Sequence, residues 1–253
     1  MKTCRKQRYL HAVIGLISVL LFFALWFFGS HRYTSFILPS PIDTFERLIQ
    51  LFQKEGLGDA LLLSARRAFY GFLLSLTIGT FLGILAGLSM IVRSAIKPLV
   101  VILMGVPPIA WIVLALLWFG LGDGTPIFTV FIATFPLLFT NALAGMCTQD
   151  PHLQTMCKVF GLSPVQRLMD LILPHLAAYI FPGAMIALAS AWKVTMMAEL
   201  LSASGGVGDQ LAAARNTLDT AGVFALISMM TVILLIFEYV ILGPIRKKIE
   251  RWR

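Results

Sequence analysis

Residues 69–92, FYGFLLSLTIGTFLGILAGLSMIV, decide the fold class of this 253-residue chain. The stretch carries no charged side chain, and about 20 apolar residues in a helix are enough to cross the hydrocarbon core of a bilayer. Within it, Gly79, Gly83 and Gly87 recur at every fourth position, a spacing that lets another helix approach closely. We predict a transmembrane helix that packs tightly against a second helix.

The composition of the whole chain points the same way. Hydrophobic residues make up 58% of the sequence and charged residues only 13%, whereas a soluble domain carries about a quarter charged residues. A soluble globule also keeps a large polar surface, which this sequence cannot supply. We therefore predict an all-α integral membrane protein.

Five further apolar stretches have the length of a membrane span. They cover residues 11–29, 96–119, 126–144, 176–202 and 223–242. The first follows a basic tail, but no small-residue cleavage site follows it, so we expect a transmembrane helix and not a signal peptide. The sequence thus predicts about six transmembrane helices.

The net charge of +8 is distributed as in a multi-pass membrane protein. Basic residues cluster at both termini and long apolar stretches separate them, which favours cytoplasmic flanks over nucleic-acid binding. With the N-terminus in the cytoplasm, six spans return the C-terminus there, and the inner segments hold about twice as many Lys and Arg residues as the outer ones. Arg66 and Arg67 run against this trend, because they precede the second span on the outer side. We expect a bacterial inner-membrane protein with both termini in the cytoplasm.

A short amphipathic helix is predicted between the first two spans. Ser40 suits its N-cap and Pro41 its first position. Apolar residues then recur at helical spacing: Ile42, Phe45, Ile49 and Phe52. The helix is too polar to span, so we expect it along the outer membrane surface, with packing on the protein's own outer face as the alternative. Together with the first span it forms an N-terminal addition, residues 1–60, to a membrane core of residues 61–253.

The longest predicted inner loop, residues 147–175, reads CTQDPHLQTMCKVFGLSPVQRLMDLILPH. Asp150 can cap a helix whose first position is Pro151, and Gly161 can end it. Ser163 can cap a second helix, which Pro174 would break. The loop therefore predicts a helix, a glycine turn and a helix on the cytoplasmic side.

The first of these two helices carries an apolar stripe. Its members stand at i, i+3, i+4 and i+7: Leu153, Met156, Cys157 and Phe160. A groove on a partner protein could cover this stripe, and so could the chain's own membrane helices. Periodicity alone leaves both possibilities open.

The loop resembles the cytoplasmic signature of permease subunits of bacterial ABC importers, E-A-A-x3-G-x9-I-x-L-P. Gly161, Leu171, Leu173 and Pro174 stand at the matching spacing. The head of the motif departs from the pattern, because Thr155-Met156-Cys157 replaces Glu-Ala-Ala. It stays open whether Thr155 takes over the contact that the usual acid makes.

Other segments resemble the nitrate, sulfonate and taurine group of these permeases. They follow the same order from residue 38 to the C-terminus: Leu38-Pro39-Ser40-Pro41, residues 64–72 (SARRAFYGF), Val106-Pro107-Pro108, residues 117–121 (LWFGL), Ala191-Trp192, Ala198-Glu199 and residues 202–208 (SASGGVG). On these segments the chain is identified as a member of that group.

The resemblance implies a permease of the type I importer fold, with a coupling helix on the cytoplasmic side. A homodimer of such permeases would form the pathway, two cytoplasmic ATPase subunits would hold ATP and Mg²⁺, and an extracytoplasmic binding protein would deliver the solute. ATP would close the ATPase pair and switch the pathway by alternating access. The implied coupling residues are Thr155, Met156, Cys157, Phe160, Gly161, Leu162, Ser163, Leu173 and Pro174.

The chain is not expected to be an enzyme or to bind a cofactor of its own. It has no G-x-x-x-x-G-K-[ST] loop, so it cannot bind ATP in the Walker manner. Its cysteines, Cys4, Cys147 and Cys157, stand in no metal-ligand spacing. No arrangement of catalytic side chains is visible in or near the spans, which argues against a membrane enzyme.

The candidate pathway residues lie within the third and fifth spans. Lys193 and Glu199 are ionisable side chains at membrane depth, which cost about 2.5–3.5 kcal/mol each to insert. Six positions apart, they point about 120° from each other and are not expected to pair. Lys193 would suit an anionic solute, with snorkelling to the interface or an ion pair as the alternatives. Glu199 matches a family position near the outer mouth, where it would gate the pathway or hold the helix end. Pro107-Pro108 would kink the third span and free carbonyl groups.

Two other modes of transport fit this sequence less well. A secondary transporter driven by an ion gradient would need carboxylates near mid-membrane, whereas Glu199 and Glu238 both lie toward span ends, the latter near Arg246. An exporter is disfavoured, because the Gly161/Pro174 loop resembles importers only. The expected function is import of a small, anionic, sulfonate-, nitrate- or taurine-like solute.

Overall fold

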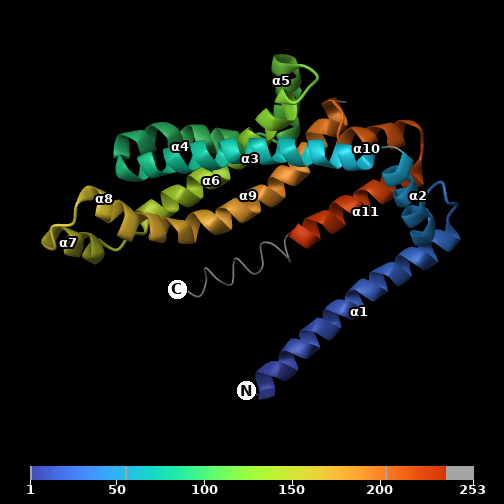
Figure 1. Cartoon of the computed structure of the whole chain (residues 1–253), viewed down its shortest axis with the longest axis horizontal. Helices are drawn as coiled ribbons and strands as arrows, with labels where there is room; N and C mark the ends of the chain where they lie inside the picture. The colour runs from blue at the N-terminus through green and yellow to red at the C-terminus, as the bar shows by residue number, and fades with distance from the viewer. Residues whose placement is uncertain (1, 55, 203, 238–253) are drawn as a thin grey trace. The chain divides into compact units, whose positions relative to one another are not determined.

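The computed structural model describes residues 2–54, 56–202 and 204–237, and the described part is helical throughout (Figure 1). The chain divides into two compact units, one of residues 1–57 and 211–231, the other of residues 58–210 and 232–253. Glu238 and Arg246 lie outside the described residues, as does the end of the predicted span 223–242.

The helices follow one another with short connections. In order they are α1 (Lys2–Arg32), α2 (Pro41–Lys54), α3 (Leu57–Leu88), α4 (Met90–Gly105), α5 (Pro108–Phe119), α6 (Gly124–Cys147), α7 (Pro151–Val159), α8 (Pro164–Gln166), the π-helical turn η1 (Arg167–Ile172), α9 (Leu173–Ser202), α10 (Val207–Asn216) and α11 (Thr220–Ile236). The all-α class is therefore confirmed for the described residues.

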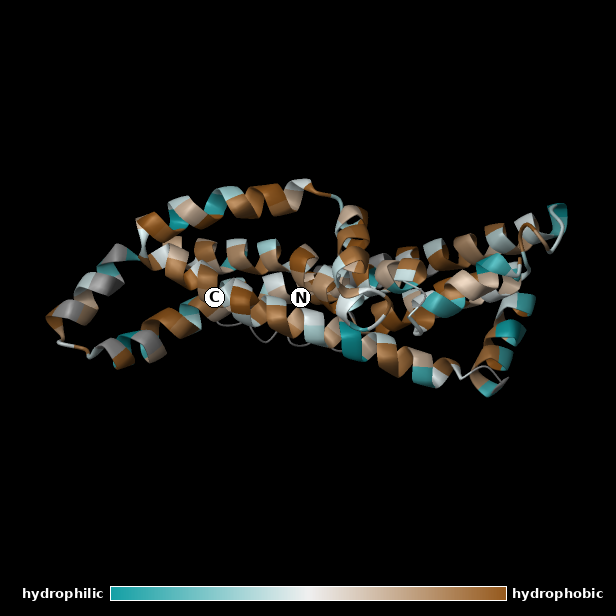
Figure 2. Cartoon of the chain, turned by 90° about the horizontal axis from the view of Figure 1, so that it is seen from above, coloured by the Kyte–Doolittle hydropathy of each residue, from teal (hydrophilic) through white to brown (hydrophobic). Residues whose placement is uncertain are grey.

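Three described helical stretches are long and apolar enough to cross a membrane. They are Leu57–Leu88, Gly124–Cys147 and Met169–Ser202, and α4 with α5 makes a fourth if the bent pair is one span. Two shorter apolar helices, Ile17–Arg32 and Thr220–Ile236, lie at the predicted first and sixth spans. Hydrophobic residues predominate along the long helices (Figure 2), as expected for segments that can cross a membrane.

The predicted second span, residues 69–92, has the wrong boundaries. α3 begins at Leu57 and ends at Leu88. Ser89 is extended, with φ −129° and ψ 122°, and its side chain accepts a hydrogen bond from the backbone N–H of Val92. Ser89 is thus the N-cap of a new helix, and this capping interaction outweighs the apolar continuity that suggested a single span.

The predicted third span, residues 96–119, is two helices and not one kinked helix. α4 ends at Gly105, α5 begins at Pro108, and the two axes meet at 99° (Figure 1). Pro107 and Pro108 both lack a backbone N–H, and each ring excludes the carbonyl of the preceding turn. Two adjacent prolines therefore break the helix completely.

α6 lies at the centre of the larger unit. Its residues Val130, Leu138, Phe139 and Ala142 are at most 1% exposed, and it packs along α9 and against α5 and α4. Phe72 of α3 joins Val130 and Leu138 in one apolar cluster. Because lipid is as apolar as these side chains, their contacts stabilise the unit through close van der Waals packing and not through removal from water.

The glycine spacing of α3 serves close contact with α6 inside this chain. A Cβ on Gly83 would lie 2.6 Å from the Cβ of Ala142, and a Cβ on Gly79 would lie 3.1 Å from that of Leu138. Gly87 approaches Met146 in the same way. The predicted close helix packing is confirmed, and its partner is the chain's own α6.

Candidate functional site

The loop between α6 and α9 begins with the predicted capped helix. The Asp150 carboxylate accepts a hydrogen bond from the backbone N–H of His152 at 2.8 Å, and α7 begins at Pro151. At its other end the N–H of Leu162 donates to the carbonyl of Cys157 at 3.0 Å, while Gly161 takes a φ of +64°. This is a Schellman-type ending, which glycine adopts without the steric penalty of a Cβ.

A capping box opens the second helix. The N–H of Gln166 donates to the Ser163 hydroxyl at 3.3 Å, and the N–H of Ser163 donates to the Gln166 side-chain oxygen at 2.9 Å. These reciprocal bonds satisfy two of the donors that a helix start leaves open. The predicted helix, glycine turn and helix are confirmed.

The predicted break at Pro174 is wrong. From Met169 to Ser202 the chain runs as one 34-residue helical stretch, and Pro174 is the second residue of α9. The π-helical turn Arg167–Ile172 lies directly before it. A π turn shifts the hydrogen bonds to i→i+5, so the carbonyls that Pro174 cannot serve find other donors. The predicted span 176–202 accordingly starts earlier.

Among the described side chains of the predicted stripe, the chain covers only Cys157. Cys157 is 5% exposed, whereas Met156 and Phe160 are 49% and 74% exposed, and the neighbouring Val159 is 79% exposed. Leu162 follows with 37%. The side chain of Leu153 lies outside the described residues. Packing on the chain's own membrane helices therefore does not account for the stripe.

The remaining predicted coupling residues also lie at the surface. Thr155, Gly161, Ser163, Leu173 and Pro174 are exposed. A Cβ on Gly161 would meet no atom within 4 Å. The structure thus brings all nine predicted residues into one loop, eight of them exposed and one, Cys157, buried.

A buried ionic cluster occupies the opposite end of the α6–α9 pair. Arg67 of α3 is 2% exposed, and Glu199 near the end of α9 is fully buried. The two side chains form an ion pair with an N–O distance of 2.8 Å. Arg67 also pairs with Asp123, which immediately precedes α6, at 2.6 Å. One guanidinium thus joins three helices.

The turn after α9 closes around this cluster. Arg67 donates to the backbone carbonyls of Ser204 and Gly205 at 2.8 and 2.9 Å. The Glu199 carboxylate accepts hydrogen bonds from the Ser64 hydroxyl at 2.6 Å and from the N–H of Gly208 at 3.1 Å. The buried charges are therefore paired and hydrogen-bonded, which buried charges require.

Glycine is needed where the turn passes the carboxylate. Gly206 has a φ of +94°, and a Cβ there would lie 2.5 Å from the Glu199 carboxyl carbon. A Cβ on Gly208 would lie 2.5 Å from the backbone carbonyl oxygen of Met196. The turn 205–208 can thus pass close to Glu199 because Gly206 and Gly208 carry no side chain.

Asp123 remains charged well into the acid range. Burial raises the pKa of its carboxyl group, but hydrogen bonds and charge attraction from Arg67 and Arg66 outweigh this, so the pKa lies below the ordinary value of 3.8. Arg66 reaches Asp123 at 2.8 Å from a more exposed position. The two arginines that ran against the predicted charge distribution therefore both have acidic partners.

Sequence reasoning identified Glu199 but missed its partners. Ser64, Arg67 and Asp123 had no assigned role, although the mismatch of Arg66 and Arg67 with the charge trend was a signal that they are paired. Glu199 pairs with Arg67. Lys193 itself is exposed.

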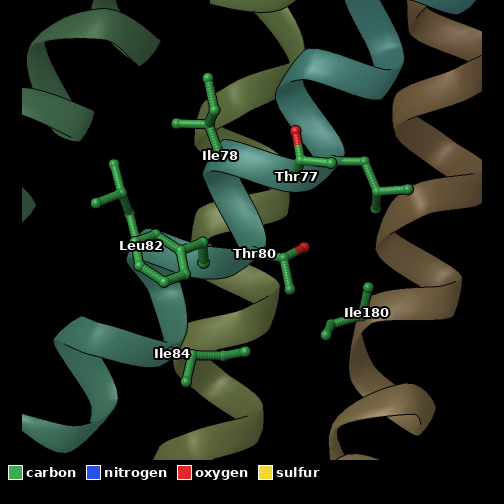
Figure 3. A pocket seen from close by; sticks show the side chains of 8 residues that line it. Thr77, Ile78, Thr80, Leu82, Ile84 and Ile180 are labelled. Atoms are coloured by element: carbon green, nitrogen blue, oxygen red, sulfur yellow. The ribbon is translucent and has the colours of Figure 1, made fainter.

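A separate hollow lies between α3 and α9. It has a volume of about 970 Å³. Figure 3 shows its two polar lining residues, Thr77 and Thr80, and Ile180 opposite them on α9. The remaining lining residues are apolar: Leu76, Ile78, Phe81, Leu82 and Ile84. No charged side chain lines it, so the hollow is not suited to holding an anion. Within the part of the chain that is described, no group of three or more His, Cys, Asp or Glu side chains could hold a metal ion.

The chain is similar to known transport proteins. Residues 79–243 match the family model described as "Binding-protein-dependent transport system inner membrane component". A probable ABC transporter permease protein of Brucella abortus (strain 2308) is 30% identical over 243 residues, covering 94% of this chain and 96% of that protein. The taurine transport system permease protein of Escherichia coli (strain K12) is 29% identical over 245 residues, covering 94% and 88%.

Solved structures share the fold. A crystal structure of an amino acid ABC transporter with histidines superposes with a TM-score of 0.66 at 14% sequence identity, covering 79% of this chain and 98% of that one. At this identity the likeness concerns the fold alone.

Proposed function

The chain belongs to the family of binding-protein-dependent transport system inner membrane components, and from this premise we propose that it imports a small anionic solute of the sulfonate, nitrate or taurine kind. Membership makes it the multi-pass inner-membrane permease subunit of an ABC importer, a component that is not itself catalytic and carries no cofactor. An ATPase and a binding protein are its implied partners. The similarity to a taurine permease over 94% of the chain supports the solute class.

The proposed arrangement in the membrane is a type I permease with six spans. α1 and α11 supply the first and the last span in sequence, and α4 and α5 share one broken span. Both termini face the cytoplasm. Residues 1–60 are the N-terminal addition and residues 61–253 the core, which pairs with a second copy in a homodimer. The acidic partner of Arg66 and Arg67 supports this orientation, since arginines paired with a carboxylate do not act as free loop charges.

We propose that the loop 147–175 is the contact through which the ATPase moves the permease. The observation that carries this proposal is the exposed apolar face of α7, with Val159 79% and Phe160 74% exposed on a helix capped at both ends. A capped helix is already ordered, so binding it in a groove costs little conformational entropy. Residues 164–202 then lead from this contact without a break to Glu199.

Glu199 is proposed to hold the helix end and not to meet the solute. Its carboxylate is buried and fully engaged by Arg67, Ser64 and Gly208. Lys193, by contrast, is exposed, and we propose that it faces the pathway and attracts the anion, with the broken helix at Pro107-Pro108 adding polar backbone groups nearby in the pathway wall. Uptake by Lys193→Leu measures this: unchanged uptake would remove Lys193 from the pathway.

The docking proposal is tested by co-purification of the permease with its ATPase. Phe160→Asp places a charge in the centre of the proposed contact and is expected to abolish the association. Leu121→Asp is the matched control, because Leu121 is 75% exposed at the other end of α6. Retention of the ATPase by Phe160→Asp, or equal loss in both variants, would refute the assignment.

Energy coupling is tested in liposomes that contain the permease, the ATPase and the binding protein. Taurine uptake is expected to require ATP inside the liposomes and to persist when ionophores collapse all ion gradients. Full-rate uptake by the permease alone, driven by an ion gradient, would instead establish the secondary transporter.

A further inference from the structure

α2 presents three different faces to its surroundings. Successive residues of a helix are 100° apart, so its fourteen residues, Pro41–Lys54, can be sorted by direction. One face is packed against its own unit, a second is apolar and exposed, and a third is polar and exposed.

The packed face is anchored by a buried residue pair and an ion pair. Thr44 and Leu51 are 4% and 3% exposed. Beside them, the Arg47 guanidinium contacts the Asp219 carboxylate at 2.7 Å, and Asp219 also accepts a hydrogen bond from the N–H of Gly222. The rotation of α2 about its axis is therefore fixed within its unit.

The apolar face lies about 130° around the axis from this packed face. It consists of Ile42, Phe45, Ile49 and Phe52, which are 61%, 64%, 41% and 49% exposed. The polar face lies on the remaining side and consists of Asp43, Glu46, Gln50 and Gln53, all exposed. A helix with separate protein, apolar and polar faces matches a position where protein, lipid and water meet.

The position of α2 next to α1 supplies the second argument. The apolar helix Ile17–Arg32 ends in His31 and Arg32, and the indole N–H of Trp26 donates to the carbonyl of Pro39, two residues before α2. Tryptophan and basic residues at the end of an apolar helix mark the membrane interface. α2 therefore starts at the depth where α1 leaves the hydrocarbon.

The chain that leads to α2 also carries exposed apolar side chains. Phe28 near the end of α1 is 70% exposed, and Tyr33, Phe36 and Ile37 in the connection to α2 are 60%, 57% and 63% exposed. Exposed apolar side chains thus occur on α1, in the connection and on α2. Lipid is the surrounding that can cover all three.

We propose that α2 is an interfacial helix whose Ile42, Phe45, Ile49 and Phe52 side chains insert between the acyl chains of the outer leaflet. Asp43 and Glu46 on the polar face repel anionic headgroups, so insertion rests on apolar burial and not on attraction to anionic lipid. The Arg47–Asp219 pair transmits this anchoring to the turn between α10 and α11.

The test is a nitroxide scan in the complete importer, reconstituted in phosphatidylethanolamine and phosphatidylglycerol liposomes. In a background with Cys4, Cys147 and Cys157 replaced by alanine, single cysteines are introduced as Phe45→Cys and Ile49→Cys, and as Glu46→Cys and Gln50→Cys for the matched polar face. A nitroxide spin label is attached to each cysteine. Frequent collision of the label with molecular oxygen shows that it lies in lipid, and frequent collision with a nickel chelate shows that it lies in water. Taurine uptake is measured on every variant.

The ratio of oxygen to nickel collision is expected to be at least about three-fold higher at positions 45 and 49 than at 46 and 50. High nickel collision at 45 and 49 would place the face in water, and low collision with both reagents would mean that a protein covers it. Either result overturns the proposal. The expected collision pattern in a variant that has lost uptake would still support the location of α2 in the membrane interface.

Discussion

The two ends of the α6–α9 pair are built in opposite ways. At one end, the loop 147–175 is ordered by local capping bonds and leaves Val159 and Phe160 exposed. At the other end, Arg67 and Glu199 are buried, and their contacts join residues more than a hundred positions apart. The first end leaves apolar side chains uncovered by the described chain, whereas the charges at the second find their partners within it.

This difference separates the consequences of mutation. Damage to the ionic cluster should unfold the chain, because it leaves buried charges without partners. Damage to the exposed loop should leave the chain folded and remove only an interaction with a partner. The four predictions below test this contrast in order of their expected effect on stability.

Arg67→Met should have the largest effect. It leaves the fully buried Glu199 carboxylate and the carbonyls of Ser204 and Gly205 without their donor, which costs about 3–5 kcal/mol. Thermal unfolding in detergent measures the loss. The double variant Arg67→Met/Glu199→Leu should recover part of it, since no buried charge remains unpaired at position 199. An unaltered melting temperature in Arg67→Met would show that the cluster does not stabilise the fold.

Gly206→Ala should follow, with a loss of about 3 kcal/mol, because a Cβ at φ +94° would also lie 2.5 Å from the Glu199 carboxyl carbon. Gly105→Ala is the control, since a Cβ at Gly105 meets no atom within 4 Å. The same unfolding measurement applies. Equal melting temperatures for the two variants would contradict the fit of the turn to Glu199.

Asp123 should contribute about 1 kcal/mol or less, because its side chain is 44% exposed and solvent screens its ion pairs. Its pKa is lower in the folded chain than the ordinary value of 3.8, so the contribution is fully present above that value and lost as the pH falls through the folded pKa. The difference in melting temperature between the natural chain and Asp123→Asn should be constant from pH 5 to 8 and shrink below about pH 4. A difference that shrinks near neutral pH would contradict the lowered pKa.

Phe160→Ala should have the smallest effect on stability, within about 0.5 kcal/mol, since the side chain is 74% exposed. Its effect on function should nevertheless be large, with ATP-driven uptake reduced at least about tenfold. Unfolding and uptake measured on the same preparation separate the two. A strongly lowered melting temperature would place Phe160 in the fold of its own chain.

What could be predicted from the sequence was local. Asp150, Gly161 and Ser163 act on neighbours within five positions, and the structure has each of them in the predicted role. The break predicted at Pro174 failed because a π-helical turn compensates for the proline, a rearrangement that residue type does not reveal. The end of α3 at Leu88 was missed because one capping serine outweighs the surrounding apolar residues.

The ionic cluster could not be derived from spacing. Arg67 finds Asp123 and Glu199 at separations of 56 and 132 residues, and only the packing of α3, α6 and α9 brings them together. The sequence did carry an indirect sign, because two adjacent arginines on the predicted outer side contradict the charge rule unless acids neutralise them.

The unbroken course of residues 164–202 has a geometric consequence. α9 alone has 30 residues, which corresponds to a length of about 45 Å. A rotation of about 10° about one end of such a rod carries the other end through about 8 Å, a distance comparable to the width of a small solute. A modest angular change at the contact with the ATPase would therefore suffice to open or close a passage at the far side of the membrane, with Pro182 as the one interior position of α9 where a missing backbone bond could absorb part of the motion.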